Sequence, residues 1–123
     1  MNELINDWIL RATNDLKVAE LLVAEENEAY EIICFHCQQY VEKILKSILT
    51  KEQIVFPRTH DLVLLINLLP DQYIEAKDVI GKIVVLNEYA VSARYPGEIV
   101  DKDDVVESLE IVHLFKDSIY KYL

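Results

Sequence analysis

Six polar residues in three stretches of the sequence have side chains suited to binding an anionic or polar ligand. They are Gln39, Lys43 and Lys46 in the first stretch, His60 in the second, and Arg94 with Tyr95 in the third. A lysine ammonium or an arginine guanidinium binds phosphate and carboxylate groups, and arginine does so through two parallel hydrogen bonds. Arg94 has the strongest pattern of the six, because a Pro96-Gly97 loop follows it at the predicted end of a helix.

Each of these residues also has a purely structural interpretation. Arg94 fits an ion pair within this acidic protein equally well, and Tyr95 before a proline fits the packing of a helix end. For His60, which follows Thr59, stabilisation of a helix start is slightly favoured over ligand contact. Gln39, Lys43 and Lys46 share one helical face, which is also the pattern of a solvated surface. Both interpretations remain open for all six residues.

Cys34 and Cys37 have the spacing of a C-x-x-C redox or metal motif. A thioredoxin-like site needs its first cysteine at a helix start after a strand, and a zinc site needs two further ligands. The flanking sequence predicts neither context. Both cysteines lie inside a predicted helix on its apolar side, where free cysteine packs as a small hydrophobic residue. His36 lies off that side and fits packing or capping, so we expect no metal site and no cofactor.

The composition predicts a single all-α domain over residues 1–123. Only two Gly and three Pro occur in the chain, which argues against a turn-rich β protein, and 52% hydrophobic residues argue against disorder. The net charge of −10 disfavours nucleic-acid binding, which needs clustered lysine and arginine. No apolar run approaches the roughly 20 residues of a membrane span, and the N-terminus has no signal-peptide pattern. We therefore expect a cytoplasmic protein without a membrane partner.

The element that must position the first three candidates is a long helix over residues 28–51, with Asn27 as its N-cap. Apolar residues repeat along it at intervals of three and four, namely Cys34, Cys37, Val41, Ile44 and Ile48. Glu42 precedes Lys46 by four residues, the favourable order for a helical ion pair. No Gly or Pro interrupts this helix, so it is predicted to form the centre of the domain.

Four further helices are predicted around this central one. The first covers residues 2–24, and the short polar turn after it requires antiparallel packing. A short helix begins at Thr59 as N-cap and ends before Pro70, and a longer one covers residues 71–93, with a kink or break before Gly81 possible. The last helix begins after Asp101 as its cap. The predicted fold is an up-and-down four-helix bundle with an additional short helix.

Three local patterns, FHCQQYVEKILKSIL, PRTHDL and NEYAVSARYP, together with Trp8 and Asp15-Leu16, resemble the HEPN family (higher eukaryotes and prokaryotes nucleotide-binding). The order of these patterns matches the family over nearly the whole chain. The resemblance implies a four-helix bundle with an extra short helix, commonly dimeric. Members of this family are often encoded beside a small nucleotidyltransferase, so the resemblance also implies a two-component system with such a partner.

Many members of the family that this chain resembles are metal-independent ribonucleases, which use an Arg followed by four to six residues and then a His. Arg94 fits the first position, but Ile99, Val100 and Asp101 occupy the places where the His would stand. Without that proton-transfer group, the resemblance implies a non-catalytic protein. It would bind a nucleotide or polar substrate and assemble with the nucleotidyltransferase in a two-component or toxin–antitoxin-like system. The alternative is a ribonuclease toxin with an altered active site.

A homodimer is expected from the amount of apolar surface as well as from the resemblance. The central helix carries apolar residues outside the Cys34 side, and other aromatic residues add to them: Ile33, Phe35, Tyr40, Leu45, Leu49, Trp8, Tyr89 and Tyr120. A small bundle is not expected to bury all of these. A twofold pairing would cover the same patch on both copies.

Overall fold

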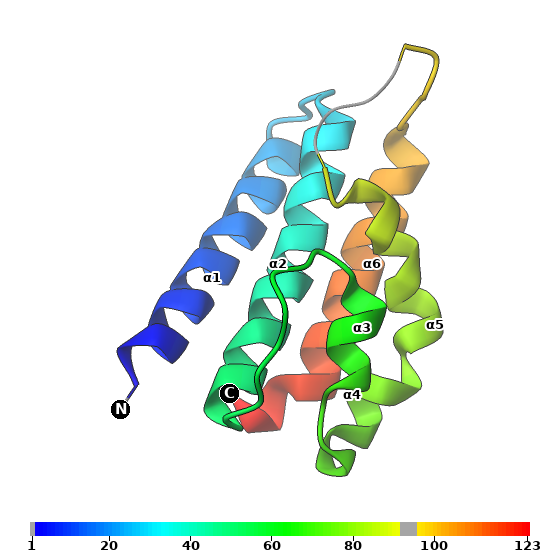
Figure 1. Ribbon diagram of the computed structural model, residues 1–123. Helices are drawn as coiled ribbons and strands as arrows, with labels where there is room; N and C mark the ends of the chain where they lie inside the picture. The colour runs from blue at the N-terminus through cyan, green and yellow to red at the C-terminus, as the bar shows by residue number, and fades with distance from the viewer. Residues whose placement is uncertain (1, 92–95) are drawn as a thin grey trace.

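Two long antiparallel helices form one side of the protein in a computed structural model that describes residues 2–91 and 96–123. They are α1 (Glu3–Ala24) and α2 (Tyr30–Lys51), and they lie side by side (Figure 1). The side chain of Asn2 caps α1 by accepting a hydrogen bond from the backbone N–H of Leu4. The antiparallel pairing predicted from the short connection is confirmed.

Both long helices end in the same hydrogen-bonded motif. After α1, the N–H of Asn27 donates to the carbonyl of Leu22, and after α2 the N–H of Ile54 donates to that of Leu49. This turn needs one residue in the left-handed backbone conformation. That residue is Glu26 (φ 55°) after α1 and Gln53 (φ 58°) after α2. The prediction of Asn27 as the N-cap of α2 is wrong, because the turn places Ala29 there and the Asn27 side chain accepts from the Ala29 N–H.

The chain between α2 and α3 (Leu62–Asn67) forms a ten-residue loop over residues 52–61. Asp61 is the N-cap of α3, with its carboxylate accepting from the N–H groups of Val63 and Leu64. The predicted start at Thr59 is therefore wrong. Thr59 instead accepts a hydrogen bond from the Asp61 N–H. The helix starts later because the carbonyl of His60 accepts from the Gln38 side chain rather than from a helical N–H.

The helix predicted over residues 71–93 is broken into short pieces. They are η1 (Asp71–Tyr73), α4 (Ile74–Asp78), α5 (Ile80–Ile83) and η2 (Val84–Tyr89). The helix breaks at Val79, just before Gly81. The sequence allows a kink or break at this position because glycine weakens a helix. The apolar spacing still buries Ile83 and Leu86. Ala93, at the end of the predicted helix, lies outside the described residues.

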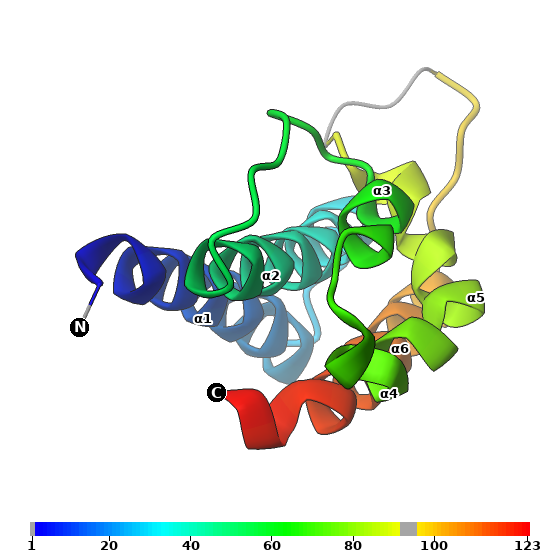
Figure 2. The same ribbon diagram turned by 60° about the horizontal axis from the view of Figure 1, so that its bottom comes forward.

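The final helix, α6 (Lys102–Ile119), begins as predicted. Asp101 is its N-cap and forms a capping box with Asp104, in which each carboxylate accepts from the other residue's N–H. A short turn, η3 (Tyr120–Tyr122), follows α6. Figure 2 shows α2 between α1 on one side and α6, α5 and α3 on the other. The chain thus forms an up-and-down bundle of helices around α2, with α3 as the additional short helix.

The structure confirms the all-α prediction but contradicts the expectation that several apolar residues of α2 stay uncovered in a single chain. The described residues are helical with no strand, and none of their helices is long and apolar enough to cross a membrane. Ile33, Tyr40, Leu45 and Leu49 are buried within a single chain because α2 has neighbours on every side. These residues therefore cannot form the surface of a dimer. The exposed apolar residues are elsewhere, with Leu10, Val18 and Leu21 on α1 among them.

Candidate functional site

A buried carboxylate organises the polar side of α2. Glu42 is only 3% exposed, and its Oε1 lies 2.8 Å from Nδ1 of His60. Its Oε2 accepts a hydrogen bond from Nζ of Lys46 at 3.1 Å. The amides of Gln38 and Gln39 donate to Oε1 at 3.2 and 3.4 Å. A buried charge is stable when it is paired and hydrogen-bonded in this way.

This network contradicts the interpretation of Gln39 and Lys46 as members of a solvated face. Gln39 is 9% exposed and Lys46 is 7% exposed. The loop over residues 52–61 covers this face of α2, and the Gln38 amide holds it there by donating to the carbonyl of His60 at 3.0 Å. The sequence did pair Glu42 with Lys46, and that ion pair is present. What sequence periodicity missed is that a loop, rather than a helix, buries the pair.

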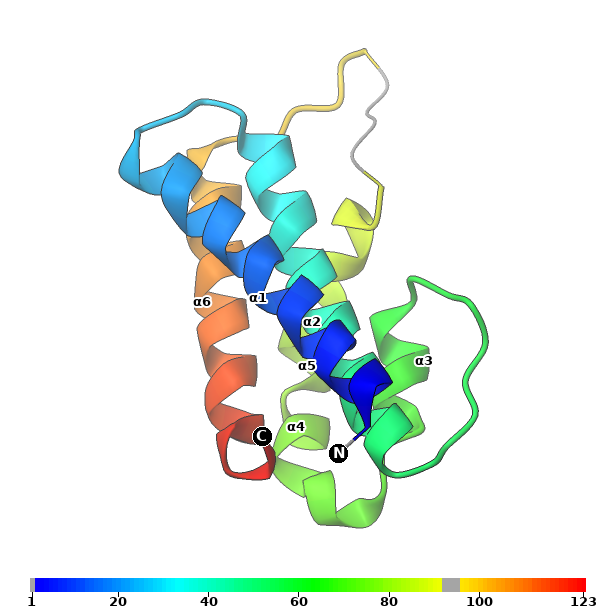
Figure 3. The same ribbon diagram turned by 90° about the vertical axis from the view of Figure 1, so that its left-hand side faces the viewer.

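The same loop forms one wall of a pocket with aromatic and cationic sides. The pocket has a volume of about 650 Å³ and is lined by Trp8, Lys46, Phe56, Arg58, Thr59 and His60. Nζ of Lys46 lies 5.5 Å from the centre of the Trp8 ring and 6.0 Å from that of Phe56, within the range of cation–π attraction. Figure 3 shows the loop standing beside the N-terminal end of α1, which carries Trp8.

Lys46 and Arg58, which both line this pocket, differ in whether they have an acidic partner. Lys46 is neutralised by Glu42, whereas Arg58 is exposed and forms no hydrogen bond or ion pair with any residue in the described parts of the chain. The His60 side chain is 61% exposed although its Nδ1 is bound to Glu42. An anion entering the pocket would therefore meet the guanidinium of Arg58 and the open side of the imidazole. Trp8 and Phe56 offer ring surface for a planar group. The sequence did not identify Trp8, Phe56 and Arg58 as members of one site, because Trp8 lies far along the chain from the loop that carries the other two.

Lys43, the remaining candidate on α2, belongs to a second ionic cluster. Its Nζ donates to Oδ2 of Asp15 at 2.6 Å, and Oδ1 of Asp15 lies 2.7 Å from Nδ1 of His36. Asp15 is a buried residue of α1 between Ala12 and Ala19, so the cluster joins α1 to α2 across their interface. A buried carboxylate needs partners of this kind. The position of Asp15 among the apolar residues of α1 was the feature of the sequence that could have predicted the cluster. The geometry assigns Lys43 and His36 a packing role.

The two cysteines are core residues, as predicted. Both are fully buried thiols, and the hydroxyl of Ser108 donates to Sγ of Cys34 at 3.4 Å. Burial raises the pKa of the Cys37 thiol far above its usual value, with smaller contributions from Cys34 and Glu20. No group of three His, Cys, Asp or Glu side chains within residues 2–91 and 96–123 is arranged to hold a metal ion.

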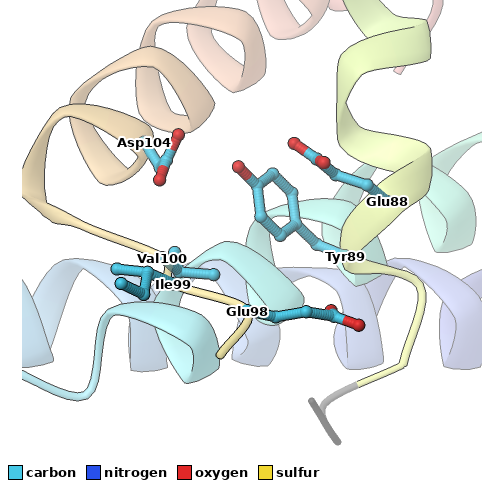
Figure 4. Close-up of a pocket in the computed structure, with 6 residues that line it drawn as sticks. All are labelled: Glu88, Tyr89, Glu98, Ile99, Val100 and Asp104. Atoms are coloured by element: carbon cyan, nitrogen blue, oxygen red, sulfur yellow. The ribbon is translucent and has the colours of Figure 1, made fainter. Parts of the chain in front are cut away.

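Arg94 and Tyr95 lie outside the described residues. A pocket of about 280 Å³ is present between η2, the segment before α6 and α6 itself, lined by Glu88, Tyr89, Glu98, Ile99, Val100 and Asp104. Figure 4 shows the Tyr89 hydroxyl pointing between the carboxylates of Glu88 and Asp104. Burial raises the pKa of Tyr89 above its usual range, and a hydrogen bond with Glu88 raises it further. The carboxylates of this pocket repel anions, so it does not suit a phosphorylated ligand.

The family model of the HEPN domain matches the chain over residues 5–121. No curated protein and no solved structure matches the chain significantly. The match covers α1 to α6 and therefore includes every residue of the Glu42 network and of the pocket beside it.

Proposed function

Because the chain belongs to the HEPN domain family, we propose that it is a non-catalytic binding protein for a nucleotide or similar polar phosphorylated ligand. In this proposal it assembles with a separate small nucleotidyltransferase in a two-component or toxin–antitoxin-like system. The association is an inference from the family resemblance of the sequence. The ligand chemistry is an inference from the pocket beside the Glu42 network.

The observation that carries the ligand proposal is the state of Arg58. In a protein of net charge −10, an arginine without an acidic partner among the described residues is available to an external anion. Arginine binds phosphate through its planar fork of donors, and the Trp8 and Phe56 rings in the same pocket suit a nucleobase. The exposed imidazole of His60 adds a further polar contact, while Lys46 and Gln39 hold the Glu42 carboxylate behind it. Arg94 and Tyr95 remain proposed ligand contacts.

We assign no reaction to this pocket, because the ribonuclease pattern lacks its His after Arg94. One observation favours the alternative of an altered ribonuclease: Arg58 and His60 line the same pocket, so a phosphate-binding cation and an imidazole are close together. An RNA-cleavage assay separates the two. The binding proposal expects no cleavage above background. Cleavage that disappears in a His60→Ala variant would establish the alternative.

The homodimer remains part of the proposal, with its interface moved to α1. Leu10, Val18 and Leu21 recur at helical spacing on the outer side of α1 and are exposed. A twofold contact between two α1 helices would cover this patch on both copies. Light scattering should give the mass of a dimer for the wild type and of a monomer for the double variant Leu10→Glu, Leu21→Glu. A wild-type monomer at high concentration would remove the dimer from the proposal.

Ligand binding is tested directly with ATP as the probe. Trp8 is the only tryptophan in the chain and lines the pocket, so its fluorescence should change as ATP binds. Arg58→Ala should weaken ATP binding by about tenfold or more, since a hydrogen bond to a charged group contributes roughly 1.5–3 kcal/mol. Arg11→Ala is the matched control, because Arg11 is exposed on α1 and pairs with Asp7. Equal ATP affinity in Arg58→Ala and the wild type would contradict the site.

Assembly is tested by co-expression with a small nucleotidyltransferase from a neighbouring gene, which the proposal expects to be present. The two proteins should purify together through a tag on either one. Absence of such a neighbouring gene, or separate elution of the two proteins at micromolar concentration, would remove the assembly from the proposed function while leaving the ATP result unaffected.

A further inference from the structure

A groove lies between α5 and α6. These two helices lie on the opposite side of α2 from α1 (Figure 2). It has a volume of about 710 Å³. Its apolar lining comes from Val85, Ile111 and Leu114, and Leu114 is 42% exposed although it lies in the middle of the protein's last long helix. The carboxylates of Glu107 and Glu110 border this lining. The groove therefore combines apolar and acidic side chains, the mixed character of a site for an amphipathic helix.

Gly81 forms a notch in the wall of this groove. A Cβ atom built on Gly81 would meet nothing within 4 Å, and its backbone is ordinary right-handed helix. The fold of the single chain thus gives no reason for glycine here, although glycine weakens the short helix α5. A missing side chain at an exposed position beside an apolar lining leaves room for a side chain that enters from outside.

The charges around the groove indicate the charge of the molecule that binds there. Asp103, Glu107, Glu110 and Asp117 recur at helical spacing on one side of α6, next to Leu114. Asp78 adds a carboxylate from the opposite wall, and Lys82 is the one cation among the lining residues. A second copy of the chain docking here by twofold symmetry would bring Glu107 and Glu110 against their own counterparts, which is repulsive. Lysine and arginine flanking an apolar helix face would be complementary.

We propose that the α5–α6 groove binds an amphipathic helix of a partner protein, with apolar side chains over Val85 and Leu114, one of them in the Gly81 notch, and basic side chains facing Glu107 and Glu110. This inference rests on the assembly half of the proposed function, because it names the surface and chemistry of that contact. It does not depend on the Trp8–Arg58 pocket, which is formed by α1, α2 and the loop over residues 52–61.

The test uses a fluorescent 18-residue synthetic peptide with leucine on one helical face and lysine on the flanking positions. Its binding to the full chain is measured by anisotropy, and a scrambled peptide of the same composition controls for simple charge attraction. Gly81→Leu fills the notch and should weaken binding by about tenfold or more. Glu107→Gln with Glu110→Gln should weaken it by roughly tenfold, as expected for two flanking ion pairs.

Matched variants make the outcome decisive. Glu25→Gln with Glu26→Gln removes two negative charges, as the groove pair does, but at the turn after α1. Gly81→Ala adds only a methyl group at the notch. Each of these control proteins should bind the peptide nearly as the wild type does. Arg58→Ala should bind the peptide normally while losing ATP, so failure of one site is distinguished from failure of the other. The inference is overturned if the scrambled peptide binds equally well, if Gly81→Leu binds like the wild type, or if the control pair of substitutions weakens binding as much as the groove pair.

Discussion

Oε1 of Glu42 lies 2.8 Å from Nδ1 of His60, which ties the loop before α3 to the middle of α2. The carboxylate at this junction is buried, and it also holds the ammonium of Lys46. Because the loop carries Phe56 and Arg58 as well as His60, its attachment to Glu42 fixes one wall of the candidate ligand pocket. The stability of the fold and the shape of the pocket thus depend on the same carboxylate.

Removal of the Glu42 charge should destabilise the protein strongly. Glu42→Gln keeps the size of the side chain but leaves Lys46, whose side chain is 8% exposed, as a buried cation without a counterion. The expected loss is about 3 kcal/mol in the free energy of unfolding, measured by urea denaturation. Glu110→Gln, at an exposed position of α6, is the control and should change little. A loss below about 1 kcal/mol in Glu42→Gln would show that Lys46 finds another partner.

Asp15 should contribute more to stability than an exposed aspartate of the same helix. Asp15→Asn removes the charge that pairs Lys43 and binds His36 across the interface of α1 and α2, and should lower the free energy of unfolding by about 1–3 kcal/mol. Asp7→Asn breaks the exposed pair with Arg11 and should have little effect. If both variants unfold at the same urea concentration as the wild type, the cluster does not hold the two helices together.

Glycine at position 53 should stabilise the protein. Gln53 adopts the left-handed conformation (φ 58°) that ends α2, and glycine takes this conformation without the strain of a Cβ atom. The left-handed conformation costs a non-glycine residue roughly 1–2 kcal/mol, and the greater freedom of glycine in the unfolded chain offsets part of this, so Gln53→Gly should raise the free energy of unfolding by up to about 1 kcal/mol. The same substitution in the middle of a helix, Lys17→Gly in α1, should lower it by about 1 kcal/mol. Changes of equal sign in the two variants would contradict the assigned end of α2.

Stability should fall at alkaline pH as buried tyrosines ionise. Burial raises the pKa of Tyr40 to about 12, with a smaller effect from Glu20, and burial together with the Glu52 hydrogen bond raises that of Tyr73 to about 12. In the unfolded chain these two tyrosines ionise near pH 10, so their contribution to stability is intact below pH 10 and declines between roughly pH 10 and 12. The slope is about 1.4 kcal/mol per pH unit for each tyrosine.

Urea denaturation at several pH values measures this decline. Tyr40→Phe should make the slope shallower, whereas Tyr120→Phe, at an exposed position, should leave it unchanged. An identical slope in Tyr40→Phe and the wild type would mean that Tyr40 does not contribute to alkaline unfolding.

The cysteines should be unreactive in the folded protein. Cys34 and Cys37 are fully buried, and burial raises the pKa of Cys37, so little of the reactive thiolate is present at neutral pH. A chromogenic disulfide reagent should modify neither thiol until urea unfolds the chain, and then both together. Rapid modification of one thiol at neutral pH without denaturant would show that this part of the core opens locally.

The fold class and the three long helices could be predicted from the sequence alone. The three- and four-residue spacing of apolar residues located α1, α2 and α6, and local chemistry located the cap at Asp101, because these features depend only on neighbours in the chain. The Glu42–Lys46 pair was also readable, since both residues belong to one helix. The burial of Cys34 and Cys37 followed from the same periodicity.

Which polar residues face solvent depends on the packing of distant segments and could not be predicted from the sequence. Helical periodicity assigns Gln39 and Lys46 to a polar face but does not say what lies over that face, and here it is a loop anchored by His60. Trp8 and Arg58 are fifty positions apart in the sequence, so their common pocket exists only once α1 and the loop meet over α2. Contacts between distant segments depend on how the elements pack, and the local pattern of a single sequence carries no record of that packing.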